Sequence, residues 1–257
     1  MIERLLLPVD VYSVAALPVD LLFNKTKLAT ATAFIWHSDR HYLITNWHNV
    51  AGMNPFTGKH LADHAGEPDA VVVYFPMREG ATDRWSVHFR LRDDQGQPNW
   101  FVHPKHGRSV DVVAIPINIP TEALPTPINK MNSEPLDIQV GMDVYVLGYP
   151  FGIGKTSLPV WKRASIASEP SLIFDQQLYM FLDTASRRGM SGAPVIRRSW
   201  SAHSLEGQKG IMGGVATRFI GVYSGRVGAP DDNLQLGLMW PASFVEEITR
   251  GNRRDSL

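Results

Sequence analysis

The segment from residue 189 to residue 194, Gly189-Met190-Ser191-Gly192-Ala193-Pro194, carries the strongest signal in the 257-residue chain. Since glycine makes up about 7% and proline about 5% of ordinary composition, the pattern G-x-S-G-x-P arises by chance in fewer than about one such chain in a hundred. Glycines on both sides of a serine allow a tight turn that presents the hydroxyl. Consecutive backbone N–H groups in such a turn can converge on an oxyanion. A plain hairpin turn is the alternative for this segment taken alone.

Two more polar residues stand at the ends of apolar segments that precede this turn. His48 follows the segment Leu43-Ile-Thr-Asn-Trp47, where an apolar strand should end, so that its ring can face a cleft as a general base. Asp111 heads the apolar run 112–116, where a carboxylate is costly unless something pairs with it. A buried acid there can orient an imidazole. The alternatives are a half-buried structural histidine and an aspartate that caps the preceding turn.

Most of the remaining chain shows period-two alternation or short β-branched runs between turn residues. This pattern predicts an all-β sandwich or barrel rather than βαβ units. One helix is predicted over Ser243–Gly251, because Ser243 and Glu246 form a capping-box pattern and Gly251 supplies a stop. The predicted strands are Thr30–His37, His41–Asn46, Ala70–Phe75, Trp85–Leu91, Val110–Ile117, Asp143–Gly148, Leu178–Asp183, Val215–Tyr223 and Leu234–Met239.

A proline-rich stretch divides the chain into two halves of similar length. Five prolines lie from Pro116 to Pro135, and proline cannot donate to a central ladder. We therefore predict two β-domains and a linker: residues 1–117 with His48 and Asp111, residues 118–140 as the linker, and residues 141–257 with Ser191 and the last helix.

The composition excludes several classes of protein. Lys+Arg and Asp+Glu both number 25, and this zero net charge argues against nucleic acid or an anionic membrane as the main partner. The chain has no cysteine, which excludes disulfides, a thiolate zinc site and a cysteine nucleophile. Prolines and aspartates interrupt the apolar residues 5–23, so this stretch fits neither a membrane span nor a signal peptide. We expect an opening strand and a loop there, in a soluble, cytoplasmic protein.

Two other motifs predict no ligand. Residues 148–156, from Gly148 to Thr156, look like a phosphate-binding loop. The motif requires four residues between its first glycine and the Gly-Lys pair, but here five residues separate them. His60 and His64 stand four residues apart with no evident third metal ligand. We therefore expect neither a cofactor nor a metal.

In the order His48, Asp111, Ser191, the chain resembles the chymotrypsin-like (trypsin-fold) serine peptidases, most closely the protease domain of their bacterial HtrA/DegP-type branch, here without a PDZ domain. The matching segments are T-N-W-H-N-V (45–50), S-V-D-V-V-A-I (109–115), G-Y-P-F-G (148–152), G-M-S-G-A-P-V (189–195) and G-L-M-W-P-A-S-F (237–244). The resemblance implies two six-stranded antiparallel β-barrels with a cleft between them and a short C-terminal helix. The interval 111 − 48 = 63 residues is longer than usual in that branch, and we assign the surplus to insertions around 51–69 and 92–98.

The resemblance also implies an activity, which is peptide-bond hydrolysis through an acyl-enzyme. It assigns Ser191 as nucleophile, His48 as general base and then acid, and Asp111 as the orienter of His48. The backbone N–H groups of Gly189 and Ser191 would form the oxyanion hole. The expected partner is a peptide or protein substrate, not nucleic acid or a membrane, and the oligomeric state is not predicted. The alternative is a catalytically silent binding or scaffold module of the same fold.

The expected substrate pocket follows from the same resemblance. Ser224, Gly225 and Arg226 match the segment that lines the primary pocket. Ala185 stands where trypsin has its specificity acid, which favours a small or medium apolar side chain over lysine or arginine. Arg226 beside the pocket could instead favour an acidic group.

Overall fold

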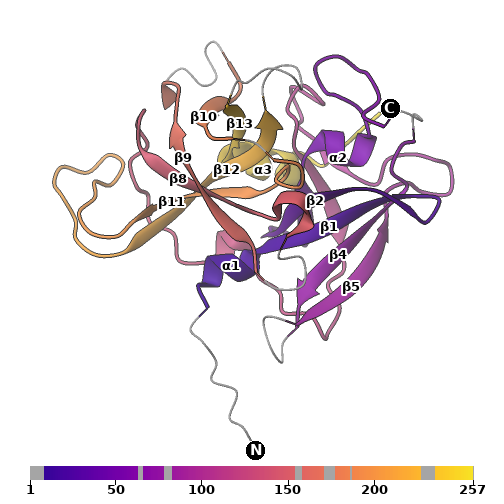
Figure 1. Ribbon diagram of the computed structural model, residues 1–257, viewed down its shortest axis with the longest axis horizontal. Helices are drawn as coiled ribbons and strands as arrows, with labels where there is room; N and C mark the ends of the chain where they lie inside the picture. Colours follow the sequence, from indigo (N-terminus) through magenta and orange to yellow (C-terminus); the bar gives the residue numbers. More distant parts are fainter. Residues whose placement is uncertain are drawn as a thin grey trace, which may run out of the picture.

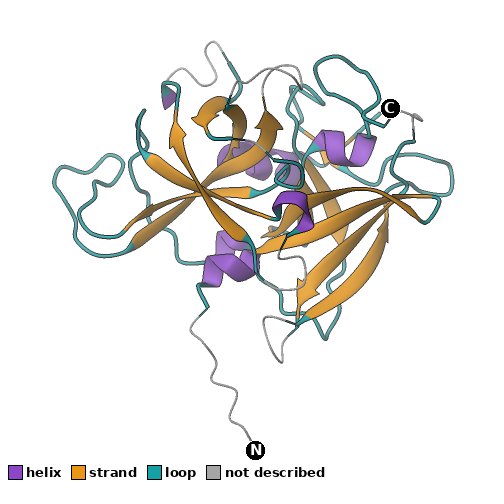
Figure 2. Cartoon of the chain, viewed as in Figure 1, coloured by secondary structure: helices purple, strands orange, loops and turns teal. Residues whose placement is uncertain are grey.

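The computed structural model describes residues 9–62, 66–77, 83–153, 158–170, 177–185, 187–226 and 235–256. Strands dominate these residues, and they form two sheets that lie side by side (Figure 1). Helices are few and short (Figure 2). The prediction of an all-β chain is therefore confirmed. Among the described residues, no helix is both long and apolar enough to cross a membrane.

The first sheet has eight strands in the order β14-β6-β7-β3-β2-β1-β4-β5, and neighbouring strands are antiparallel. Its strands are β1 (Ala16–Phe23), β2 (Thr26–His37), β3 (His41–Thr45), β4 (Ala70–Pro76), β5 (Arg84–Arg90), β6 (Phe101–Val102), β7 (Val113–Ile117) and β14 (Arg253–Arg254).

This first sheet does not close into the six-stranded barrel that we predicted. Closure would require β6 to pair with β5, but β6 has only two residues, and its free edge pairs with β14. In that pair Arg253 lies opposite Val102. The C-terminal end of the chain thus returns to the first sheet and occupies the edge where closure would occur (Figure 1).

The second sheet is a closed six-stranded antiparallel barrel in the order β10-β13-β12-β11-β8-β9, as predicted for this half. Its strands are β8 (Asp143–Gly148), β9 (Val160–Ile166), β10 (Met180–Asp183), β11 (Pro194–Ser199), β12 (Ala216–Arg226) and β13 (Leu236–Pro241). Buried side chains such as Val146, Leu182 and Val195 fill its interior.

Each predicted strand overlaps a strand of the structure, whereas β6, β9, β11 and β14 were not predicted. In β11 the apolar-polar alternation fails, because Val195, Ile196 and the guanidinium-bearing Arg197 are all buried. Arg197 reaches the backbone carbonyl of Asp137, which compensates the burial of its charge.

The opening strand, β1, tolerates a proline because of where its partners lie. Pro18 pairs with Thr32 of β2, but the pairing of β1 with β4 begins only at Val19. The missing N–H of Pro18 therefore costs no bond to β4. Asp20 in the same strand is buried and accepts a 2.9 Å hydrogen bond from the hydroxyl of Tyr74.

The helices are α1 (Val11–Ala15), α2 (Trp47–Ala51) and α3 (Ala242–Gly251), with 3₁₀ turns η1 (Ile128–Lys130) and η2 (Pro150–Gly152). The predicted helix is confirmed as α3, but the predicted capping box is wrong. The helix begins one residue earlier, after Pro241, and has no side-chain cap. Its end is set by Asn252, whose φ of 47° is left-handed, rather than by Gly251.

A shared core joins the two sheets. Phe34, Tyr42 and Ile44 of the first sheet lie in one buried cluster with Leu147 and Val222 of the barrel. Burying each such side chain contributes roughly 1.5–3 kcal/mol. Residues 118–140, all of them described, run between the sheets with η1 and isolated bridges but no strand. The shared core thus holds the two sheets against one another.

Candidate active site

His48 lies on α2, the one-turn helix that follows β3. Trp47 and Val50 anchor this helix, because both are buried in the core of the first sheet. The intervening His48 side chain keeps 16% of its surface exposed. Its Nδ1 lies 2.7 Å from Oδ2 of Asp111, and its backbone N–H donates to Oδ1 of Asp111 at 2.9 Å. The structure therefore brings His48 and Asp111 into direct contact.

The Asp111 carboxylate is buried and fully engaged. Only 1% of its surface is exposed, in the loop immediately before β7. The hydroxyl of Ser224, on β12 of the barrel, donates to Oδ2 of Asp111. The side chain of Asn46 donates to the backbone carbonyl of Asp111 at 2.7 Å. The carboxylate itself has three partners, the Ser224 hydroxyl and the backbone N–H and Nδ1 of His48, which fix its orientation and compensate its burial.

Ser191 faces the same cavity as this pair. A cavity of about 410 Å³ is lined by His48, Asp111, Ser191, Ser224 and Gly225. Within the described part of the chain, the Ser191 hydroxyl makes no hydrogen bond to another group. It is therefore open to the cavity. In enzymes without bound substrate, catalytic hydrogen bonds are often long or absent and form when the substrate binds.

The backbone of the turn presents two unoccupied donors. Gly189 has a φ of +94°, which glycine adopts without strain. The carbonyl of Arg188 accepts a 2.7 Å bond from the N–H of Phe151. In a trans peptide the N–H points opposite to the carbonyl, so the N–H of Gly189 faces away from Phe151. Across the residues described, neither the Gly189 N–H nor the Ser191 N–H donates to a protein acceptor.

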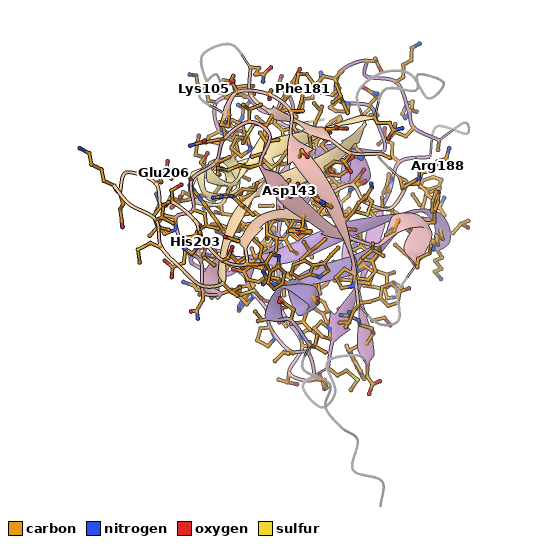
Figure 3. The ribbon with its side chains drawn as sticks, turned by 60° about the vertical axis from the view of Figure 1, so that its left-hand side comes forward. Lys105, Asp143, Phe181, Arg188, His203 and Glu206 are labelled. Carbon is orange, nitrogen blue, oxygen red and sulfur yellow. The ribbon has the colours of Figure 1, made fainter. Side chains whose placement is uncertain are left out.

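The cavity has an apolar wall and a cationic rim. The side chains of Phe56, Leu61, Phe151 and Leu238 line it together with the arginines at 187 and 188. Figure 3 shows Arg188 at the margin of the molecule.

The positive charge of this rim extends beyond the cavity lining. The pKa of Lys162 is lowered, first by burial and then by the positive charge of Arg187. Lys162 therefore lies near enough to Arg187 for the two positive charges to interact.

Sequence reasoning missed Phe56 and Leu61. Both lie in the 51–69 stretch that we assigned to an insertion, and both are more than half exposed. Large apolar side chains on a loop soon after His48 were the available signal.

The remaining predicted site residues have different outcomes. Ala185 is half-buried and does not line the cavity. Arg226 ends β12 and pairs with Gly237, while its side chain lies outside the described residues. His60 is exposed and His64 lies outside the described residues. In the ranges that the structure describes, no three His, Cys, Asp or Glu residues come together as a metal site.

Gly192 is required by the close approach of the turn to β2 and β3. A Cβ at Gly192 would lie 2.1 Å from the carbonyl oxygen of Thr32 and 2.3 Å from Oγ1 of Thr45. Gly141 has nearly the same φ, +83° against +84°, but nothing within 4 Å. We expect Gly192→Ala to lower the free energy of unfolding by about 3 kcal/mol or more, and Gly141→Ala by about 1 kcal/mol. Urea denaturation measures both, and equal losses would contradict the steric account.

Comparisons with known proteins give one match at the level of sequence families. The model of the family described as "Trypsin-like peptidase domain" matches residues 31–202, well over half of the chain. This range contains His48, Asp111 and Ser191. No curated protein matches the chain in sequence.

Solved structures match over nearly the whole chain. A variant of the HtrA-type protease AlgW with a tripeptide has a TM-score of 0.52 and 14% identity, covering 93% of this chain and 60% of that chain. The Rv3671c protease from M. tuberculosis in its active form has a TM-score of 0.50 and 18% identity, and the match covers 95% of this chain and 83% of that chain. The serine endoprotease from Yersinia pestis has a TM-score of 0.50 and 15% identity, and the match covers 96% of this chain and 69% of that chain. At these identities the likeness is one of fold. The chain spans 60% of the length of the AlgW chain.

Proposed function

Because the chain belongs to the trypsin-like peptidase family, we propose that it is a serine endopeptidase that cleaves peptide bonds through an acyl-enzyme. This family is the one that the sequence motifs predicted. The observation that carries the proposal is the bond of 2.7 Å between His48 Nδ1 and the buried Asp111 carboxylate, at a cavity that Ser191 also lines. Aspartate, histidine and serine on one cavity are the components of a nucleophilic triad.

In the proposed reaction, Ser191 Oγ forms a bond to the carbonyl carbon of the substrate while its proton passes to Nε2 of His48. The C=O electron pair moves to the oxygen, which the N–H groups of Gly189 and Ser191 stabilise. Collapse of the intermediate breaks the C–N bond, and His48 gives its proton to the leaving amine. Water then repeats the sequence on the acyl-enzyme, releasing the acid and restoring the Ser191 hydroxyl.

Asp111 acts on His48 in two ways. By accepting from Nδ1, it keeps the proton on that nitrogen and leaves the lone pair on Nε2 free to act as the base. Once His48 is protonated, the adjacent negative charge stabilises the imidazolium, and this attraction is strong because Asp111 is 1% exposed. Ser224 supports both effects, since its hydroxyl donates to the same Oδ2.

The cavity lining favours some side chains over others. Leu238, which is 3% exposed, contributes an apolar surface next to Ser224 and Gly225. Arg187 and Arg188 at the rim repel cationic substrates. We therefore assign an apolar or acidic residue, and not lysine or arginine, to the acyl side of the cleaved bond.

The proposed function also includes the division of the chain into residues 1–117, 118–140 and 141–257. In this proposal the catalytic groups come from both parts that flank the linker.

Labelling with a fluorophosphonate probe tests the proposed function. We expect stoichiometric labelling at Ser191 and hydrolysis of a mixed peptide library, with cleavage after apolar or acidic residues. The alternative, a silent binding module, predicts peptide binding without labelling or cleavage. Absence of labelling on the folded protein would overturn the proposal, and fastest cleavage after lysine or arginine would overturn the assigned specificity.

A further inference from the structure

Thr32 is a buried polar residue that takes no part in the chemistry described above. It lies in β2 of the first sheet and is 0% exposed. Its Oγ1 is 2.7 Å from the carbonyl oxygen of Gly189 and 3.2 Å from the backbone nitrogen of Tyr149. One hydroxyl of the first sheet therefore contacts two segments that belong to the barrel half of the chain.

The direction of both hydrogen bonds is fixed by chemistry. A carbonyl oxygen can only accept and a backbone N–H can only donate, while a hydroxyl does one of each. The Thr32 hydroxyl thus donates its single proton to Gly189 and accepts from Tyr149. Since the site is buried, neither partner has water as a substitute.

These bonds act on the peptide planes around Gly189. The carbonyl of Arg188 is held by the N–H of Phe151 at 2.7 Å, which orients the plane before Gly189. The carbonyl of Gly189 is held by Thr32 and orients the plane after it. Glycine at a φ of +94° has few conformational restraints of its own, so external bonds must fix these planes.

The main chain of Thr32 holds the peptide plane that follows Ser191, the residue of the other proposed oxyanion donor. Its N–H donates to the carbonyl of Ser191 at 2.9 Å. Its carbonyl accepts from Oγ1 of Thr45 at 2.9 Å, and Thr45 Oγ1 accepts from the side chain of Asn49, also at 2.9 Å. Asn49 adjoins His48 on α2, so the same network reaches the helix that carries the base.

We propose that Thr32 is a positioning residue that sets the oxyanion hole, through its hydroxyl at Gly189 and through its N–H at Ser191. The inference rests on the proposed function, because it concerns the same site. It also explains why a threonine hydroxyl is buried in β2, where its neighbours Ala31 and Ala33 are apolar.

The Thr32→Val variant tests the role of the hydroxyl, since valine has the same shape but can neither donate nor accept. We expect kcat to fall by about 10- to 100-fold, because a displaced oxyanion donor loses much of its effect. KM should change by less than about threefold, since the cavity walls are unaltered. The affinity for a peptide boronate, whose oxygen occupies the oxyanion hole, should fall by the same factor as kcat/KM.

Two further variants separate positioning from general stability. Thr32→Ser keeps the hydroxyl and should restore kcat to within about threefold of wild type. Thr126→Val is the matched control, because Thr126 is 6% exposed and donates to the carbonyl of Val14 at 3.0 Å, away from the cavity. Its kcat should stay at the wild-type value. A Thr32→Val enzyme with wild-type kcat, or a Thr32→Ser enzyme as slow as Thr32→Val, would overturn the inference.

Amide hydrogen exchange provides a readout that does not depend on activity. The N–H groups of Tyr149 and Phe151 should exchange faster in Thr32→Val and at the wild-type rate in Thr126→Val. If wild type is neither labelled nor active, the proposed function fails, yet this exchange still decides whether Thr32 holds the turn. Unchanged exchange of the Tyr149 N–H would overturn the inference that the Thr32 hydroxyl holds this segment.

Discussion

Ser191→Ala is expected to lower kcat by about 10⁴- to 10⁶-fold and to abolish fluorophosphonate labelling. The loss is this large because no other group can form the acyl-enzyme, and only the oxyanion donors and substrate binding remain to assist water. The variant should still fold, since the Ser191 hydroxyl makes no hydrogen bond within the described residues. Steady-state kinetics with a cleavable peptide, intact-protein mass spectrometry after labelling and a thermal melt measure these three outcomes.

The control for this variant is Ser201→Ala. Ser201 is exposed on the connection between β11 and β12, outside the residues that line the cavity. It should be labelled and should turn over peptide like the wild type. Labelling of Ser191→Ala at the wild-type level would place the nucleophile elsewhere.

Local patterns together with the family resemblance led to the proposed chemistry of the site. His48 and Asp111 stand at the ends of apolar segments, and Ser191 lies in a G-x-S-G-x-P turn; both kinds of pattern are visible in a single sequence. Ser224 and Gly225 also line the cavity as the motif implied. The roles proposed for these residues came from the resemblance to the trypsin-fold peptidases.

Features set by distant contacts could not be predicted in this way. The first sheet stays open because Arg253 and Arg254 pair with β6, and two arginines carry no strand signal. Thr32 looks like an ordinary β-former, since its partner Gly189 lies 157 residues further along the chain. Phe56 is a large apolar residue on a loop soon after His48, but its position in the sequence does not show that this loop folds against the cavity.

The arrangement of the proposed catalytic groups depends on the contact between the two sheets. His48 and Asp111 come from the first sheet, whereas Ser191 and Ser224 come from the barrel. Ser224 donates to Asp111 across that contact, and Thr32 donates to Gly189 in the opposite direction. Polar bonds in both directions give the contact a defined register that apolar packing alone does not impose.

Asp111→Asn is expected to lower kcat by about 10⁴-fold at neutral pH while leaving the fold intact. The backbone N–H of His48 donates to Oδ1 of Asp111, so the amide oxygen of asparagine must take that position. The amide NH₂ then replaces Oδ2 and faces Nδ1 of His48. A donor at that place forces Nδ1 to accept, which moves the imidazole proton to Nε2. His48 then has no lone pair directed at Ser191 and cannot act as the base.

The measurement is a pH–rate profile of Asp111→Asn beside Asp20→Asn. Asp20 is also a buried carboxylate, 5% exposed, and accepts from Tyr74 at 2.9 Å, but it lies in β1 outside the cavity lining. Both variants lose a buried charge, so a general effect on stability would slow both. Only Asp111→Asn should lose turnover, and its rate should rise with pH as hydroxide replaces the missing base. A kcat within about tenfold of wild type would show that Asp111 does not set the tautomer of His48, because positioned general bases supply roughly 10²–10⁴.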